Sequence, residues 1–136
     1  MMSFLYNRTC YKPKFIGLLY PVVTMNGSVA HKRSRRGILG VWGQWNEKMC
    51  DSLSIENHVV SDCVPVFCAN CKDDKVVNYK NSMLLDSALV ANKVSHLYVQ
   101  YQTGGHGFGV SEKKGSAESR TWKESFINWL LTDVYK

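Results

Sequence analysis

The feature that most constrains the fold of this chain is a change of hydrophobic period between residues 64 and 101. The segment 63–70 (CVPVFCAN) is a short apolar run of strand length, and 95–101 (SHLYVQY) alternates and is rich in β-forming residues. Between them, small and apolar residues recur at three- and four-residue spacing over 79–91, which predicts a helix. This order predicts two adjacent parallel strands, near 64–70 and 95–101, joined by a right-handed crossover.

The rest of the sequence supplies further elements for the same sheet. The run 15–23 (FIGLLYPVV) predicts a strand covered on both faces, with Pro21 near its end or on a bulge. A polar, glycine-bearing loop is expected after it to about residue 40, and a short helix within 41–54. Apolar residues on one helical face predict a terminal helix over 121–134. With 136 residues, of which 45% are hydrophobic, we expect one α/β domain over the whole chain.

Composition argues against several classes of partner. The longest apolar stretch has nine residues, whereas a membrane-spanning helix needs about 20, so no membrane partner is expected. The net charge is +6, and the run 31–36 (HKRSRR) carries four of the positive charges. No aromatic residue is interleaved in this run and no nucleic-acid motif surrounds it, which favours a solvated basic loop over a nucleic-acid site. The five cysteines are not densely spaced, which favours reduced thiols and a cytoplasmic location.

Two polar loops place an acid and a histidine at the same edge of the predicted sheet. Asp73 and Asp74 follow the first strand of the crossover, and His106 lies in the glycine-rich segment 102–110 (QTGGHGFGV) after the second. Parallel neighbours end at the same edge and lie about 4.8 Å apart, so these loops are neighbours. An acid holding Nδ1 would leave Nε2 as a general base, and flanking glycines would leave the ring exposed. The alternative is a flexible loop with an incidental histidine, and spacing alone favours neither.

These residues carry a family resemblance. The stretch 64–109 resembles the last third of an α/β-hydrolase, where a strand, an acid loop, a helix and a final strand lead to the catalytic histidine. The match is closest to small esterases of the acetyl-xylan-esterase and feruloyl-esterase-like group, which are also similar to the catalytic domains of prolyl oligopeptidases. Upstream, 20–40 (YPVVTMNGSVAHKRSRRGILG) resembles the family's Tyr-Pro-Val strand and the loop after it. The resemblance covers about residues 13–131 and implies a partial α/β-hydrolase fold of C-terminal parallel strands with crossover helices.

The resemblance also implies site residues. Asp74 matches the family's triad acid and His106 its triad base, in an enzyme that hydrolyses carboxylic esters without a metal or other cofactor. The implied substrate is a small ester or an acylated carbohydrate. The sequence departs from the family's usual residues at Arg33, Asn70, Cys71 and Asn78.

The family's nucleophile is missing from the sequence. α/β-Hydrolases carry it in Gly-x-Ser-x-Gly, ahead of the acid and the histidine, and neither this motif nor an oxyanion loop is present. Ser28 follows a glycine, but neither the second glycine of the motif nor a predicted helix comes after it, so we do not expect it to be the nucleophile. We expect a chain that is inactive alone, with a missing N-terminal half or a second copy, bound through the exposed sheet, as its partner. The alternatives are an inactive, truncated hydrolase-like binding protein and a serine peptidase of the prolyl oligopeptidase type.

Cysteines suggest one rival site. Cys63, Cys68 and Cys71 could bind zinc, with Cys50 or His58 as a fourth ligand. Because they lie in or beside a predicted strand and no second Cys-x-x-Cys occurs, we favour buried, structural thiols over a metal site or a redox pair. The remaining histidines have no partner pattern: His31, His58 and His96.

Overall fold

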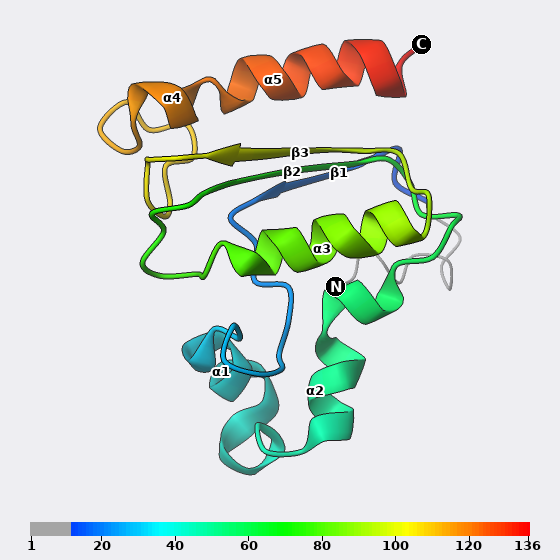
Figure 1. Ribbon diagram of the computed structural model, residues 1–136, viewed down its shortest axis with the longest axis vertical. Helices are drawn as coiled ribbons and strands as arrows, with labels where there is room; N and C mark the ends of the chain where they lie inside the picture. The colour runs from blue at the N-terminus through cyan, green and yellow to red at the C-terminus, as the bar shows by residue number, and fades with distance from the viewer. Residues whose placement is uncertain (1–11) are drawn as a thin grey trace.

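A three-stranded parallel sheet, in the order β1-β2-β3, organises the chain (Figure 1). The computed structural model describes residues 12–136. The strands are β1 (Ile16–Leu19), β2 (Val66–Cys71) and β3 (His96–Tyr101). In the register, Val66 of β2 lies opposite Ile16 on one side and His96 on the other. The predicted parallel pairing of the last two strands is confirmed, and so is the α/β class.

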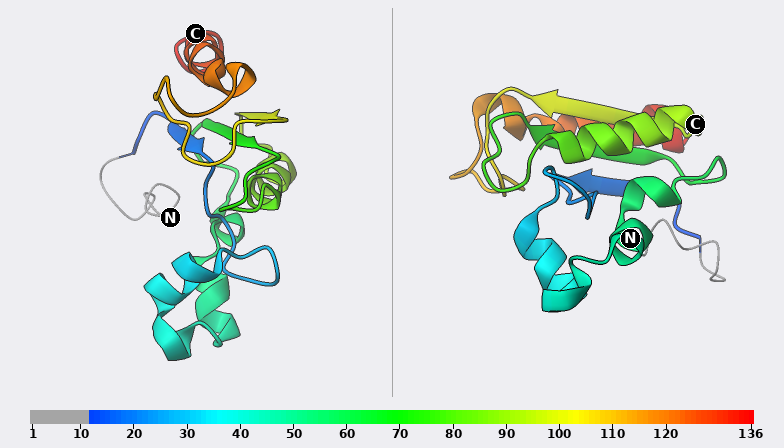
Figure 2. Two further views of the ribbon diagram at one scale, coloured as in Figure 1. Left: turned by 90° about the vertical axis from the view of Figure 1, so that its left-hand side faces the viewer. Right: turned by 60° about the horizontal axis from the view of Figure 1, so that its bottom comes forward.

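Helices cover both faces of this sheet. They are α1 (Lys32–Gly43), α2 (Glu47–Leu53), a short 3₁₀ helix (Ile55–His58), α3 (Lys80–Ala91), α4 (Ala117–Arg120) and α5 (Trp122–Trp129), which continues into a π-helical turn (Leu130–Val134). α3 and α5 lie on opposite sides of the sheet, while α1 and α2 form a hairpin beyond α3 (Figures 1 and 2). Within residues 12–136, no helix is long and apolar enough to cross a membrane.

Strand β2 is the centre of two hydrophobic cores because its alternating side chains point to opposite faces. Every one of its residues is buried. Val66 and Cys68 pack in the core that contains Leu85 and Leu89 of α3. On the other face, the core combines residues of β2 with the aromatic residues of α5: Phe67, Ala69, Cys71, Phe126 and Trp129. A fully buried side chain such as Leu85 stabilises the fold by about 1.5–3 kcal/mol, so these two cores fix the strand on which the acid loop begins.

Strand β1 is shorter than predicted. It ends at Leu19, because Tyr20 adopts a left-handed backbone conformation (φ 43°) and Pro21 has no N–H to pair. The backbone N–H groups of Val23 and Thr24 instead donate to Oδ1 of the buried Asn81, at 2.9 and 3.1 Å. The predicted strand over 15–23 therefore survives only in its first half.

The prediction of a polar loop up to residue 40 is wrong, because residues 32–43 form α1. His31 begins this helix: its Nδ1 accepts from the backbone N–H of Ser34, at 3.4 Å, and lies 2.8 Å from Ser34 Oγ. Basic residues in the first turn oppose the helix dipole, and Gly40 (φ 73°) kinks the helix, so the sequence lacks the usual helical signals. Tertiary packing compensates, because Leu39 is buried against Met25 and Cys50.

The remaining helix predictions are confirmed with adjusted bounds. The crossover helix predicted over 79–91 is α3, and the terminal helix predicted over 121–134 is α5 with its π-helical turn. The helix expected within 41–54 is α2, which occupies only 47–53 and begins at Asn46, whose side chain accepts from the N–H of Met49.

Candidate active site

The loops after β2 and β3 bring an acid and a histidine into direct contact. His106 Nδ1 lies 2.7 Å from Asp74 Oδ2. The Asp74 side chain is 1% exposed and the His106 side chain is 28% exposed. A buried carboxylate thus holds one nitrogen of the ring, while part of the ring remains open to solvent.

Backbone hydrogen bonds fix the Asp74 carboxylate. Its Oδ1 accepts from the N–H groups of Val76 and Val77, at 2.8 and 2.9 Å. With Oδ1 occupied in this way, Oδ2 is the oxygen that accepts from His106, so Nδ1 carries the proton of the neutral ring. His106 Nε2, which has no hydrogen-bond partner among residues 12–136, is then an acceptor, which is the state a general base requires.

Asp73 holds the backbone of the loop that carries His106. Its Oδ2 and Oδ1 accept from the backbone N–H groups of Gly104 and Gly105, at 3.2 and 2.9 Å. The two neighbouring aspartates therefore have different contacts: Asp73 binds the backbone of the loop, and Asp74 binds the imidazole ring of His106. Sequence reasoning placed both in this loop but found no role for Asp73.

Only glycine fits at position 104. Its φ is 138°, and a Cβ there would collide with Ser119 Oγ and lie 2.7 Å from Cys71 Sγ. Beside it, the Glu118 carboxylate accepts from the N–H groups of Gln102 and Thr103. The loop before His106 is therefore tightly fixed, in contrast to the flexible loop weighed in the sequence.

Tyr20 completes the surroundings of the histidine ring. The ring centroids of Tyr20 and His106 are 4.5 Å apart, and Tyr20 also packs edge-on against Phe108 at 5.0 Å. A left-handed conformation costs a non-glycine residue about 1–2 kcal/mol, so the surrounding packing must hold Tyr20 in place. The sequence analysis did not predict this contact. The one feature that could have indicated it is the Tyr20–Pro21 pair at the end of a strand.

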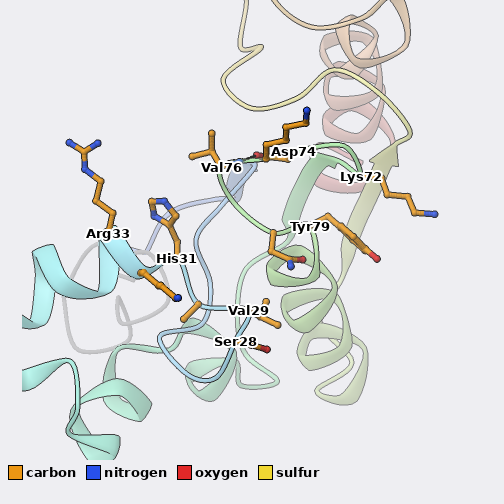
Figure 3. Close-up of a pocket in the computed structure, with 12 residues that line it drawn as sticks. Ser28, Val29, His31, Arg33, Lys72, Asp74, Val76 and Tyr79 are labelled. Atoms are coloured by element: carbon orange, nitrogen blue, oxygen red, sulfur yellow. Dashed lines mark hydrogen bonds between the residues drawn. The ribbon is translucent and has the colours of Figure 1, made fainter.

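A hollow of about 580 Å³ lies between the acid loop and the start of α1 (Figure 3). Asp74 and Ser28 both line it, but no hydrogen bond joins Ser28 to His106 in the part of the chain described. In Figure 3, Ser28 lies at the far end of the hollow from Asp74. His31 and Arg33 line the α1 side, so the basic run belongs to the wall of this hollow.

The thiols of the Cys-x-x-Cys step do not form a common site. Cys68 packs on the α3 face of the sheet and Cys71 on the α5 face. Burial raises the pKa of Cys68 to about 12, and burial together with the Asp73 charge raises the pKa of Cys71 to about 11. Both are protonated thiols at neutral pH, unlike metal-binding or redox cysteines. Over residues 12–136 no group of three or more potential metal ligands lies together, and Cys10 lies outside the described residues.

Among residues 12–136, no hydrogen bond joins the other histidines to this pair. His96 Nε2 is 3.0 Å from Asp86 Oδ1, at the opposite end of β3. His58 Nε2 lies 2.7 Å from the backbone carbonyl of Ser52, and His31 begins α1 as described. His106 is therefore the histidine that an acid holds at the carboxyl edge of the sheet, where open α/β sheets bind ligands, while His31 lines the hollow beside Asp74.

Comparisons with known proteins agree with this architecture. No family model matches the sequence. An acetylxylan esterase from Xylanibacter ruminicola is 35% identical over 102 residues, which are 72% of this chain and 21% of that protein. Among solved structures, an acetyl ester-xyloside bifunctional hydrolase from Caldicellulosiruptor lactoaceticus is 27% identical with a TM-score of 0.81, over 89% of this chain and 43% of that one. A carboxylesterase from Lactobacillus plantarum, 19% identical with a TM-score of 0.72, shares the fold.

The parallel sheet, with helices on both faces, is a partial α/β-hydrolase fold. In sequence and structure the chain is similar to an acetylxylan esterase and to esterases with the α/β-hydrolase fold, as the sequence resemblance predicted. It spans about a fifth of the length of the acetylxylan esterase that it matches.

Proposed function

We propose that this chain supplies the acid and the base of a serine-hydrolase-type triad that cleaves carboxylic esters. The observation that supports this most directly is the 2.7 Å contact between His106 Nδ1 and the buried Asp74 Oδ2. In this role His106 is the base and Asp74 its orienting partner.

The chemistry follows from the free Nε2. As a hydroxyl oxygen attacks the ester carbonyl, Nε2 takes the hydroxyl proton, and Asp74 stabilises the imidazolium. Nε2 then returns the proton to the leaving alkoxide, and water repeats the cycle on the acyl-enzyme. The attacking serine and the oxyanion donors come from outside this sequence, since it contains no Gly-x-Ser-x-Gly.

The proposed substrate is a small ester or an acylated carbohydrate, such as an acetyl ester on xylan. Its support is the similarity to proteins described as an acetylxylan esterase and as an acetyl ester-xyloside hydrolase.

The proposed partner is an N-terminal hydrolase half that adds strands beside β1. Among the described residues β1 pairs only with β2, so its outer edge has free backbone groups. Self-association through the same edge is the alternative. We also propose a reducing, cytoplasmic environment, which the free thiols of Cys50, Cys63, Cys68 and Cys71 support.

A complementation assay tests the proposal. The chain is fused behind an N-terminal α/β-hydrolase segment that carries Gly-x-Ser-x-Gly, and hydrolysis of 4-nitrophenyl acetate is measured. His106→Ala should lower kcat by about a thousandfold or more, whereas His58→Ala, on the α2 side of the molecule, should leave it unchanged. Undiminished turnover by the His106→Ala fusion would contradict the assignment. Faster cleavage of a peptide amide than of the ester would favour the peptidase alternative.

A further inference from the structure

A second hollow, of about 540 Å³, lies on the α1–α2 hairpin and shares no lining residue with the hollow beside Asp74. Arg35 of α1 and Glu47 and Asp51 of α2 form part of its wall. Gln44 and Trp45, in the connection between the two helices, form another part. In Figure 1 this hairpin lies at the opposite end of the molecule from α5.

Trp45 gives the hollow an aromatic wall. The residue is 73% exposed, although indole is among the side chains with the most apolar surface to bury. The Arg35 guanidinium carbon lies 5.8 Å from the Trp45 ring centroid, which holds the indole beside the hollow. A flat, exposed aromatic face next to polar groups can pack against the C–H face of a pyranose ring.

Polar groups around Trp45 lack partners. Arg35 Nε is buried and has no hydrogen-bond partner among the described residues. Neither the Glu47 carboxylate nor Gln44 Oε1 accepts a hydrogen bond from any residue in 12–136. An apolar partner surface would bury the Glu47 carboxylate and Gln44 Oε1 unsatisfied, at a cost of about 1–3 kcal/mol each. A ligand rich in hydroxyl groups would satisfy them, because a hydroxyl both donates and accepts.

The charges in the hollow select against ionic ligands. One guanidinium, of Arg35, faces two carboxylates, of Glu47 and Asp51. An anion would be repelled by the carboxylates, and a cation would meet Arg35. A neutral ligand with several hydroxyl groups matches this lining best.

We propose that this hollow is a carbohydrate-binding site that takes a pyranose unit of a neutral oligosaccharide, stacked on Trp45 and hydrogen-bonded by Arg35, Gln44 and Glu47. The site is separate from Asp74 and His106 and does not depend on the proposed ester chemistry. In a protein that acts on decorated polysaccharide, it would hold the chain while another segment reacts.

Calorimetric titration of the purified 136-residue chain tests the site. The probe is a hexasaccharide of β-1,4-linked xylose, and a galacturonic acid oligomer of equal length is the charged comparison. We expect saturable binding of the neutral probe, a loss of about tenfold or more in Trp45→Ala, and weaker binding of the charged oligomer. Arg35→Lys, which keeps the charge but removes the guanidinium beside Trp45, should also weaken binding.

Trp42→Ala is the matched control. Trp42 is 87% exposed on the same hairpin but does not line the hollow, so its loss should leave the affinity within about twofold. His106→Ala should bind as the wild type does. The proposal is overturned if no saturable binding occurs, if Trp42→Ala and Trp45→Ala weaken binding equally, or if the charged oligomer binds more tightly. Self-association that both tryptophan variants abolish, without sugar binding, would also overturn it and assign the face to a second copy.

Discussion

At the scale of single residues, Asp74 determines which nitrogen of His106 carries the proton. In Asp74→Asn, the amide oxygen is needed for the N–H groups of Val76 and Val77, so the NH₂ group turns to Nδ1. His106 should then change to the tautomer protonated at Nε2 and lose its free acceptor. Side-chain ¹H–¹⁵N NMR should show protonated Nδ1 in the wild type and protonated Nε2 in the variant.

Asp86→Asn serves as the control for this experiment, because Asp86 contacts His96 rather than His106. It should change only the His96 signals. An Asp74→Asn spectrum in which His106 keeps its Nδ1 proton would show that the carboxylate does not set the tautomer.

The two adjacent glycines before His106 make a second prediction, because they differ in the space around them. Gly104→Ala would place a Cβ against Ser119 and Cys71, whereas the Cβ in Gly105→Ala (φ 63°) would meet nothing within 4 Å. Gly105→Ala should therefore cost only the backbone strain, about 1 kcal/mol, and Gly104→Ala about 1–3 kcal/mol more from overpacking. Urea unfolding of both variants measures the difference, and equal losses would contradict the close packing at position 104.

At the scale of secondary-structure elements, the β2–α3–β3 crossover was predictable from sequence because its period and lengths are regular. Asp74 and His106 follow from that crossover, since adjacent parallel strands end at one edge. Spacing could not distinguish Asp74 from Asp73, and only the family motif did. α1 was not predictable, because its stability comes from burying Leu39 rather than from its glycine-rich, basic sequence. The Tyr20 contact was not predictable either, since it depends on the turn after β1.

The buried thiols of β2 predict a stability that falls in alkali. The folded chain raises the pKa of Cys68 from 9.0 to about 12, and that of Cys71 to about 11. Because the folded-state values are raised, the thiols contribute their full stability below about pH 9, and this contribution is lost as pH rises through about 11. Urea midpoints at about pH 8 and about pH 10.5 should differ for this reason.

Removing both thiols isolates their contribution. The Cys68→Ala/Cys71→Ala double variant should be less stable at neutral pH, because it leaves cavities, but should lose less stability between the two pH values. Part of the decrease in stability with rising pH should remain, since burial also raises the pKa of Tyr98, to about 12. If the double variant lost as much stability between the two pH values as the wild type, these thiols would not be the cause of the loss.

At the scale of the whole molecule, the acid–histidine pair lacks the groups that make acyl transfer fast. We expect the 136-residue chain alone to show no appreciable serine-esterase activity, because losing the nucleophile costs on the order of a millionfold in turnover. A fluorophosphonate probe, which labels only an activated serine, should leave the purified chain unmodified. Labelling at one serine that His106→Ala diminishes would identify a nucleophile in this chain and contradict the proposed division of the triad.

The hydrogen bonds that hold the loop carrying His106 come mostly from residues between β2 and α4. Asp73, Asp74, Glu118 and Ser116 hold it, so one continuous stretch from β2 to α4 encodes Asp74, His106 and most of the residues that position them. Such a stretch can be inherited, exchanged or synthesised as a unit without separating the two groups. If a gene were divided anywhere before β2, Asp74 and His106 would stay on the same piece. Under the proposed division of the triad, a hydrolase gene could be split before β2 without separating the acid from the base.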